Sequence, residues 1–101
     1  MKAIIYESNT GFTERYAKLL SSKLDIPAYT IAQGKKAVEK GAEVIFMGWV
    51  FANKINGLDK AKKQWSVIAA AAVGMNPKTD ENTEIVRKAN KLEIPLFYLW
   101  G

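Results

Sequence analysis

Residues 3–13 read Ala-Ile-Ile-Tyr-Glu-Ser-Asn-Thr-Gly-Phe-Thr, and they set the organisation of the chain. The first four are an uninterrupted apolar run, which is typical of a parallel strand buried on both faces. From Phe12 to Leu24 the apolar residues recur at helical spacing, and Pro27 prevents the helix from continuing. The stretch therefore predicts a strand, a polar loop and an amphipathic helix in direct succession.

The rest of the chain repeats this alternation. The run of residues 66–73 is rich in alanine, which favours helix, but its place before the turn Gly74-Met75-Asn76-Pro77 favours a central strand. Thr79, followed by two acidic residues, is a good helix start. We expect strands at 3–6, 28–31, 43–48, 66–73 and 94–100, and helices at 12–24, 33–40, 58–64 and 79–92.

Strict alternation of strand and helix predicts one α/β domain spanning residues 1–101, a doubly wound, parallel, five-stranded sheet with helices on both faces. In such three-layer sheets, ligands bind beyond the carboxyl ends of the strands, where the strand order reverses. The loops after Tyr6, Gly48 and Val73 are therefore the candidate binding loops.

Composition excludes several kinds of chemistry. The chain has no cysteine and no histidine, so it has no disulfide, thiol nucleophile, zinc finger or histidine base. A redox role would have to come from a bound cofactor. No apolar run is long enough to span a membrane and no leader peptide is recognisable, so we expect a cytoplasmic protein.

The chain is basic, with 15 Lys and Arg against 10 Asp and Glu. Local clusters occur at Lys35-Lys36, at residues 60–63 and at residues 87–91, each spaced among apolar positions of helical period. They are interpreted as the solvated faces of three helices, although the charge would also attract an acidic partner.

The first loop has the chemistry of an anion site. A helix start leaves backbone N–H groups unpaired and partly positive, so a phosphate can bind there without a cationic side chain. Ser8, Thr10 and Thr13 add hydroxyl donors, and Gly11 lets the backbone bend tightly. The patterns of the P-loop and of the dinucleotide fold are absent from the chain.

The loop Ser-Asn-Thr-Gly-Phe-Thr resembles the phosphate loop of flavodoxins, Ser/Thr-x-Thr-Gly-x-Thr, in residue type, spacing and setting. This resemblance to flavodoxins and flavodoxin-like FMN oxidoreductases extends over the whole chain. It implies the strand order 2-1-3-4-5 and FMN as the cofactor. The residues that it assigns to the phosphate are Ser8, Asn9, Thr10, Gly11, Phe12 and Thr13.

The resemblance also implies that the isoalloxazine ring lies between the loops after the third and fourth strands. Trp49 or Phe51 would stack on the ring, or else pack on the adjacent helix. The remaining expected contacts are Val50, Ala52 and Asn53 in the first of these loops, and Gly74, Met75 and Asn76 in the second.

Two departures from the family bear on function. The second ring loop has fewer acidic residues than is usual in flavodoxins, which favours a less negative reduction potential. The basic charge favours an acidic redox partner. The resemblance is compatible with two functions. The protein could be an electron carrier that works with a partner protein or a small-molecule acceptor, or an oxidoreductase that acts on a quinone or a porphyrinogen-like substrate. No catalytic residue is assigned, Glu7 included.

A different class of function also fits these residues. A cofactor-free interaction module would have the same fold and use its basic helices to bind an acidic protein or a nucleic acid, of which nucleic acid is the less expected partner. Such a module would bind weakly and in a salt-sensitive manner.

The C-terminal strand leaves one expectation open. Flavodoxin-like chains continue into a last helix, whereas this sequence stops at Gly101. Leu96, Tyr98 and Trp100 would point to one sheet face and Phe97 and Leu99 to the other, so one of these two apolar sets would lack its usual cover. Either the sequence is a fragment that lacks the C-terminal helix, or a second chain covers this face, as in a homodimer through the C-terminal strand.

Overall fold

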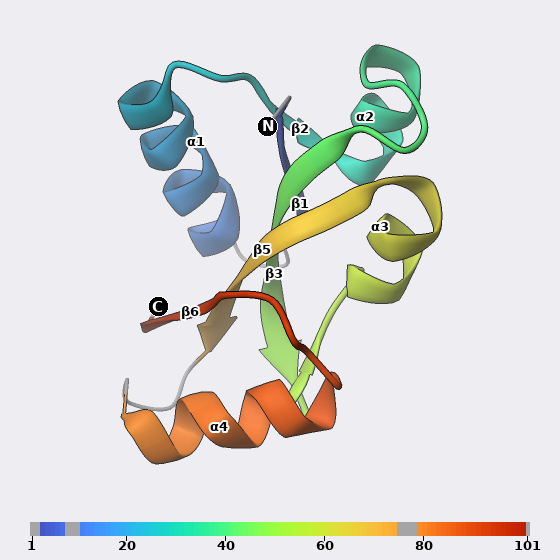
Figure 1. Cartoon of the computed structure of the whole chain (residues 1–101). Helices are drawn as coiled ribbons and strands as arrows, with labels where there is room; N and C mark the ends of the chain where they lie inside the picture. The colour runs from blue at the N-terminus through green and yellow to red at the C-terminus, as the bar shows by residue number, and fades with distance from the viewer. Residues whose placement is uncertain (1–2, 8–10, 75–78, 101) are drawn as a thin grey trace.

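The computed structural model describes residues 3–7, 11–74 and 79–100. Five parallel strands form its main sheet, in the order β2-β1-β3-β5-β6 (Figure 1). This confirms the order expected from the sequence, because β5 and β6 are the fourth and fifth parallel strands. Their bounds are Ala3–Glu7 (β1), Ala28–Thr30 (β2), Glu43–Phe51 (β3), Ser66–Gly74 (β5) and Leu96–Trp100 (β6).

The order of the strands reverses between β1 and β3. These two strands pair in register from Ala3 with Val44 to Glu7 with Gly48. The chain leaves β1 toward β2 on one side and later returns to β3 on the other, so the carboxyl ends of β1 and β3 flank the switch point. The predicted phosphate loop follows β1 at this point.

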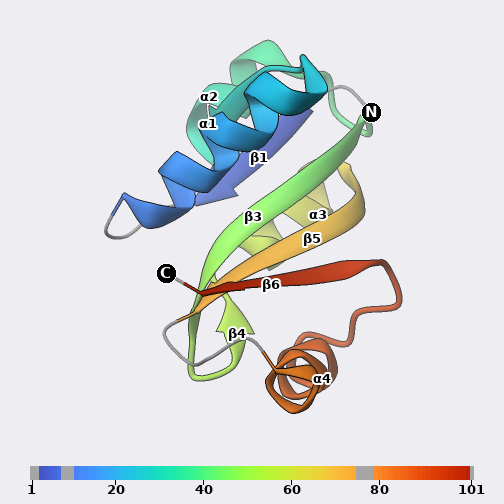
Figure 2. The ribbon, with the colours of Figure 1, turned by 90° about the vertical axis from the view of Figure 1, so that its left-hand side faces the viewer.

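Helices lie on both faces of the sheet. α1 (Phe12–Leu24) is on one face, and α2 (Ile31–Ala37) and α3 (Leu58–Gln64) are on the other (Figures 1 and 2). α4 (Asp80–Ala89) lies beside β6 and contacts β4, a short strand at Lys54–Ile55. Of the described helices, none combines the length and apolar character needed to cross a membrane.

The core is divided by the sheet into two clusters. The larger one packs α2, α3 and α4 against the sheet and includes Phe46, Leu58 and Trp65. The smaller one lies under α1 and includes Ile4, Tyr6, Ala17, Met47 and Ala71. Neighbouring strand residues join opposite clusters because side chains alternate across a strand.

The second helix begins earlier than the predicted range of 33–40. Thr30 accepts a hydrogen bond from the backbone N–H of Gln33 at 3.2 Å, and the Gln33 side chain accepts one from the N–H of Thr30 at 3.1 Å. This capping box starts α2 at Ile31, and the helix ends at Ala37, four residues before Gly41. The Thr-x-x-Gln signal was present in the sequence, so the predicted boundary was wrong for a local reason.

The third strand is longer than expected, and the loop that was predicted after Gly48 is a β-hairpin. β3 continues to Phe51 and pairs antiparallel with β4, Val50 opposite Ile55. Ala52 and Asn53 form the turn with left-handed φ angles of 51° and 64°. This backbone is the one that a tight hairpin requires, and asparagine tolerates it better than alanine does.

No helix of the described residues covers the face of β5 and β6 on the α1 side. Figure 2 looks toward this face, with α1 beside the bare strands β5 and β6. Phe97 is 59% exposed there, and Leu99 is half-buried. The expectation that one apolar set of the last strand lacks cover is confirmed for these residues.

Candidate cofactor site

The N-terminus of α1 is the described part of the predicted phosphate site. Gly11 is its N-cap, with a left-handed φ of 92°, and as a glycine it has no side chain of its own to cap the first amides. A Cβ at Gly11 would meet no atom of the described residues within 4 Å. Ser8, Asn9 and Thr10 lie outside the described residues.

The two other predicted phosphate residues lie on opposite sides of this first turn. Thr13 is buried, at 1% exposure, and Phe12 is 44% exposed. A left-handed glycine at a helix start fits a phosphate bound through backbone N–H groups. The described part of the loop thus has the backbone that the sequence pattern requires.

One carboxylate lies close to this turn. Glu14 forms an ion pair with Lys18 at 3.2 Å and hydrogen-bonds with the hydroxyl of Tyr6, which is buried beneath α1. Burial first, and the Glu14 charge second, raise the pKa of Tyr6 above its ordinary value. The Lys18 ammonium lowers the pKa of Tyr6 and so partly offsets the effect of Glu14.

The predicted ring contacts of the third strand lie on the hairpin. Trp49 and Phe51 point to the α1 side of the sheet, with ring centroids 6.0 Å apart and an edge-to-face angle of 66°. Phe51 is 70% exposed, and Trp49 is half-buried. Val50 points to the other face and packs on the larger core cluster, so the structure separates it from the aromatic pair.

The hairpin is held by the C-terminal end of α4. Asn90, the C-cap of α4, accepts a hydrogen bond from the N–H of Ile55 at 2.9 Å and donates one to the carbonyl of Asn53 at 2.9 Å. The Lys54 ammonium donates to the carbonyl of Ala89. Sequence reasoning missed Asn90, because its partners lie 35 and 37 residues away and no local pattern points to them.

The second ring loop is described only at its start. Gly74 ends β5 and pairs with Trp100, while Met75 and Asn76 lie outside the described residues. A Cβ at Gly74 would come within 2.1 Å of the Tyr98 hydroxyl oxygen, so a larger residue would clash there. The packing of Tyr98 in β6 therefore requires glycine at position 74.

A polar pocket of about 370 Å³ opens on the α3 side of the same edge, lined by Glu7, Ile55, Asn56, Gly57, Asp59 and Lys60. Ile5 belongs to the cluster under α2 and α3, so alternation points Glu7 to that side as well, away from α1. In the described parts of the chain, no group of acidic residues could hold a metal ion.

Comparison with known proteins gives the class of fold. The structure is similar to that of a flavodoxin from the domain Archaea, with a TM-score of 0.61 and 16% sequence identity, over all of this chain and 84% of the archaeal one. No protein-family model matches the sequence, and no curated protein matches it. The protein has a flavodoxin-like α/β fold, and at this identity the likeness shows the fold alone.

Proposed function

We propose that this protein binds FMN and transfers electrons through it. The observation that carries the proposal is the left-handed glycine turn at Gly11, which begins α1 at the switch point of a flavodoxin-like sheet, in a loop with the flavodoxin phosphate pattern. When bound, FMN would supply the redox chemistry that the side chains of this chain lack. We propose a cytoplasmic location, as the sequence suggests.

The proposed roles follow from the position of each residue. The first-turn amides of α1 and the hydroxyls of Ser8, Thr10 and Thr13 hold the phosphate, with Asn9, Gly11 and Phe12 completing the loop. Trp49 or Phe51 stacks on the ring, and the backbone of Ala52, Asn53 and the loop 74–76 meets its polar edge. Electrons would pass to a redox partner protein or to a small acceptor such as a quinone or a porphyrinogen-like substrate.

Phosphate recognition is tested by comparing FMN with riboflavin in fluorescence titrations. We expect FMN to bind more tightly, because riboflavin lacks the phosphate. Thr10→Ala and Thr13→Val should each weaken FMN by about 1.5–3 kcal/mol, the value of a hydrogen bond to a charged group, and leave riboflavin unchanged. Thr13→Val keeps the buried shape of the side chain. Thr83→Val, in α4, is the control; equal affinities for FMN and riboflavin would contradict the proposal.

Ring stacking is tested by the emission of the bound flavin. The true stacking partner quenches it, so replacing that residue with Ala should restore emission and shift the reduction potential. Phe51→Ala should cost little stability because the side chain is 70% exposed, which makes it the cleaner variant. If Trp49→Ala and Phe51→Ala both leave emission unchanged, the ring does not lie on the hairpin.

The charge distribution favours a second candidate, a cofactor-free module for an acidic partner. Residues 31–65 hold seven lysines and three acidic residues, so four of the five net positive charges belong to the α2–α3 half of the sheet. The lysines of α2 and α3 are all exposed. This candidate predicts a colourless protein whose binding of an acidic polypeptide weakens steeply with salt.

A further inference from the structure

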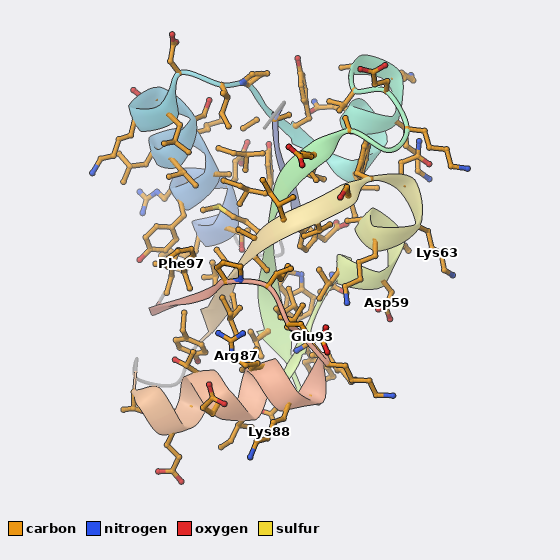
Figure 3. All side chains as sticks on the ribbon, in the orientation of Figure 1. Asp59, Lys63, Arg87, Lys88, Glu93 and Phe97 are labelled. Carbon is orange, nitrogen blue, oxygen red and sulfur yellow. The ribbon has the colours of Figure 1, made fainter. Side chains whose placement is uncertain are left out.

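The bare face of β5 and β6 holds a groove of about 380 Å³ whose lining is apolar throughout. Leu20 and Leu24 of α1 form one wall, and Phe97 and Leu99 of β6 form the other. Figure 3 shows Phe97 on the side of the sheet on which α1 lies. Exposed apolar surface of this kind is costly in water and marks an interaction site.

The dimensions of the groove suit one α-helix. Neighbouring strands are about 4.8 Å apart, so two uncovered strands offer a floor about 10 Å wide, which is the diameter of a helix with its side chains. The floor includes Ala69 and Ala71 of β5, whose small side chains allow a close approach. Among the residues that the structure describes, no polar side chain lines the groove to orient a small ligand.

The wall formed by α1 is itself an apolar ridge. Phe12, Tyr16, Leu19 and Leu20 recur at spacings of three and four residues, so they share one flank of the helix with the groove-lining Leu24. Leu19 is 54% exposed and Leu24 is 42% exposed. The molecule thus presents an apolar helical ridge directly beside a groove that fits a helix.

The strands of this face carry little charge, whereas α1 is basic. β5 and β6 contain no charged residue, and Glu43 is the only one in β3. α1, with Glu14, Arg15, Lys18 and Lys23, carries a net charge of +2, and α2 and α3, across the sheet from the groove, carry +2 each. Two copies meeting through the bare face would keep the charge of α2 and α3 on their outer sides, and salt screens the repulsion between the two α1 helices beyond about 8 Å.

We propose that the bare face is the contact between two copies of this chain, with α1 of each copy seated in the groove of the other. A ridge beside a matching groove is complementary to itself under a two-fold axis. A stable interface buries about 800 Å² on each partner, which is roughly one eighth of the 6183 Å² surface of the chain. The arrangement does not depend on FMN.

Sedimentation equilibrium, with and without FMN, tests this arrangement. We expect a dimer, and we expect Leu19→Lys and Phe97→Lys each to weaken it on the order of 100-fold, because the symmetry removes every contact twice. Both side chains are more than half exposed, so the variants should fold. Ile85→Lys, at an exposed apolar position of α4, is the matched control and should leave the dimer intact.

The ridge-in-groove geometry has its own test. Mixing Leu19→Glu chains with Phe97→Lys chains should restore dimers that neither variant forms alone, because the mutated ridge meets the mutated groove across the interface. A monomeric wild-type chain at millimolar concentration would overturn the proposal. A dimer lost with Phe97→Lys but unaffected by Leu19→Lys would also overturn it, since β6 would then pair edge to edge without α1.

Discussion

Gly48, in β3, lets residues 55 and 56 at the end of the hairpin approach this strand closely. A Cβ at this position would lie 2.6 Å from the carbonyl oxygen of Asn56 and 2.8 Å from side-chain atoms of Ile55 and Phe46. The nearest of these atoms is backbone and cannot turn away. Because Gly48 has no side chain, β4 can pack closely against β3, the strand that carries the predicted ring contacts.

Gly48→Ala should destabilise the fold by about 1–3 kcal/mol, the usual cost of overpacking. Urea unfolding measures the loss. Gly41→Ala is the comparison, because its Cβ would meet nothing within 4 Å and only the φ of 87° opposes it; we expect a loss of about 1 kcal/mol there. Equal losses in the two variants would mean that the close approach at Gly48 is relaxed at little cost.

Tyr6 couples stability to alkaline pH. Its pKa is raised in the folded chain, so as the pH rises past about 10 the unfolded chain loses the Tyr6 proton first. The unfolded state then binds fewer protons, and the free energy of unfolding falls with pH. This contribution is fully present below the unfolded pKa and is lost as the pH rises through the folded pKa.

Tyr6→Phe should therefore flatten the alkaline decline, as measured by urea unfolding between pH 8 and pH 11, a window set by the ordinary tyrosine pKa of about 10. Glu14→Gln should keep most of the decline, because burial is the larger cause of the raised pKa and the Glu14 charge the smaller one. An unchanged slope in Tyr6→Phe would show that Tyr6 ionises alike in both states.

The hairpin β3–β4 differs from a free loop because α4 holds it in place. Asn90 joins three segments through its side chain. It donates hydrogen bonds to the carbonyl of Val86 in α4 at 2.8 Å and to the carbonyl of Asn53, and it accepts one from the N–H of Ile55. A hydrogen-bonded clamp at a helix end fixes the orientation of the aromatic pair before any ring arrives, which lowers the entropic cost of binding.

Two substitutions of Asn90 distinguish the contributions of its donated and accepted hydrogen bonds to stability. Asn90→Asp keeps an acceptor for Ile55 but loses both donated hydrogen bonds, whereas Asn90→Ala also leaves the Ile55 N–H unpaired. We expect a loss of stability of about 1–3 kcal/mol for Ala and a smaller one for Asp. Hydrogen exchange at the Ile55 amide reports on the clamp; unchanged protection in Asn90→Ala would mean that the hairpin holds without it.

The whole molecule has two unlike sides. The α2–α3 side is well packed and basic, and the α1 side ends in an uncharged apolar groove. A domain of this size has little stability to spare, and the unburied apolar surface lowers it further. Covering the groove should therefore contribute a large share of the stability of the protein.

If two copies cover each other, the melting temperature should rise with protein concentration. Mass action predicts a rise of roughly 5–10 °C over a hundredfold increase in concentration for a domain of this size. Leu19→Lys should abolish the dependence and Ile85→Lys should retain it, as followed by circular dichroism. A wild-type melting temperature that is independent of concentration would contradict the shared-groove dimer.

Much of the fold follows from local pattern. Uninterrupted apolar runs identify buried parallel strands, and helical spacing with Pro27 bounds α1 at its observed residues, Phe12–Leu24. Strict alternation then leaves few topologies, because crossovers between parallel strands are right-handed and short. The turn at Gly11 was predictable for a similar reason, since only glycine readily adopts the left-handed backbone that this loop requires.

Contacts between distant segments were not predictable in this way. Val50 to Ile55 reads as a loop because Ala52 and Asn53 carry no strong hairpin signal, and the turn is stabilised by Asn90 from 37 residues away. The groove likewise depends on the side-by-side placement of α1, β5 and β6, which no single segment encodes. Local patterns specify backbone conformation through short-range sterics and hydrogen bonds, whereas the fit between segments arises only when packing brings their side chains within contact distance.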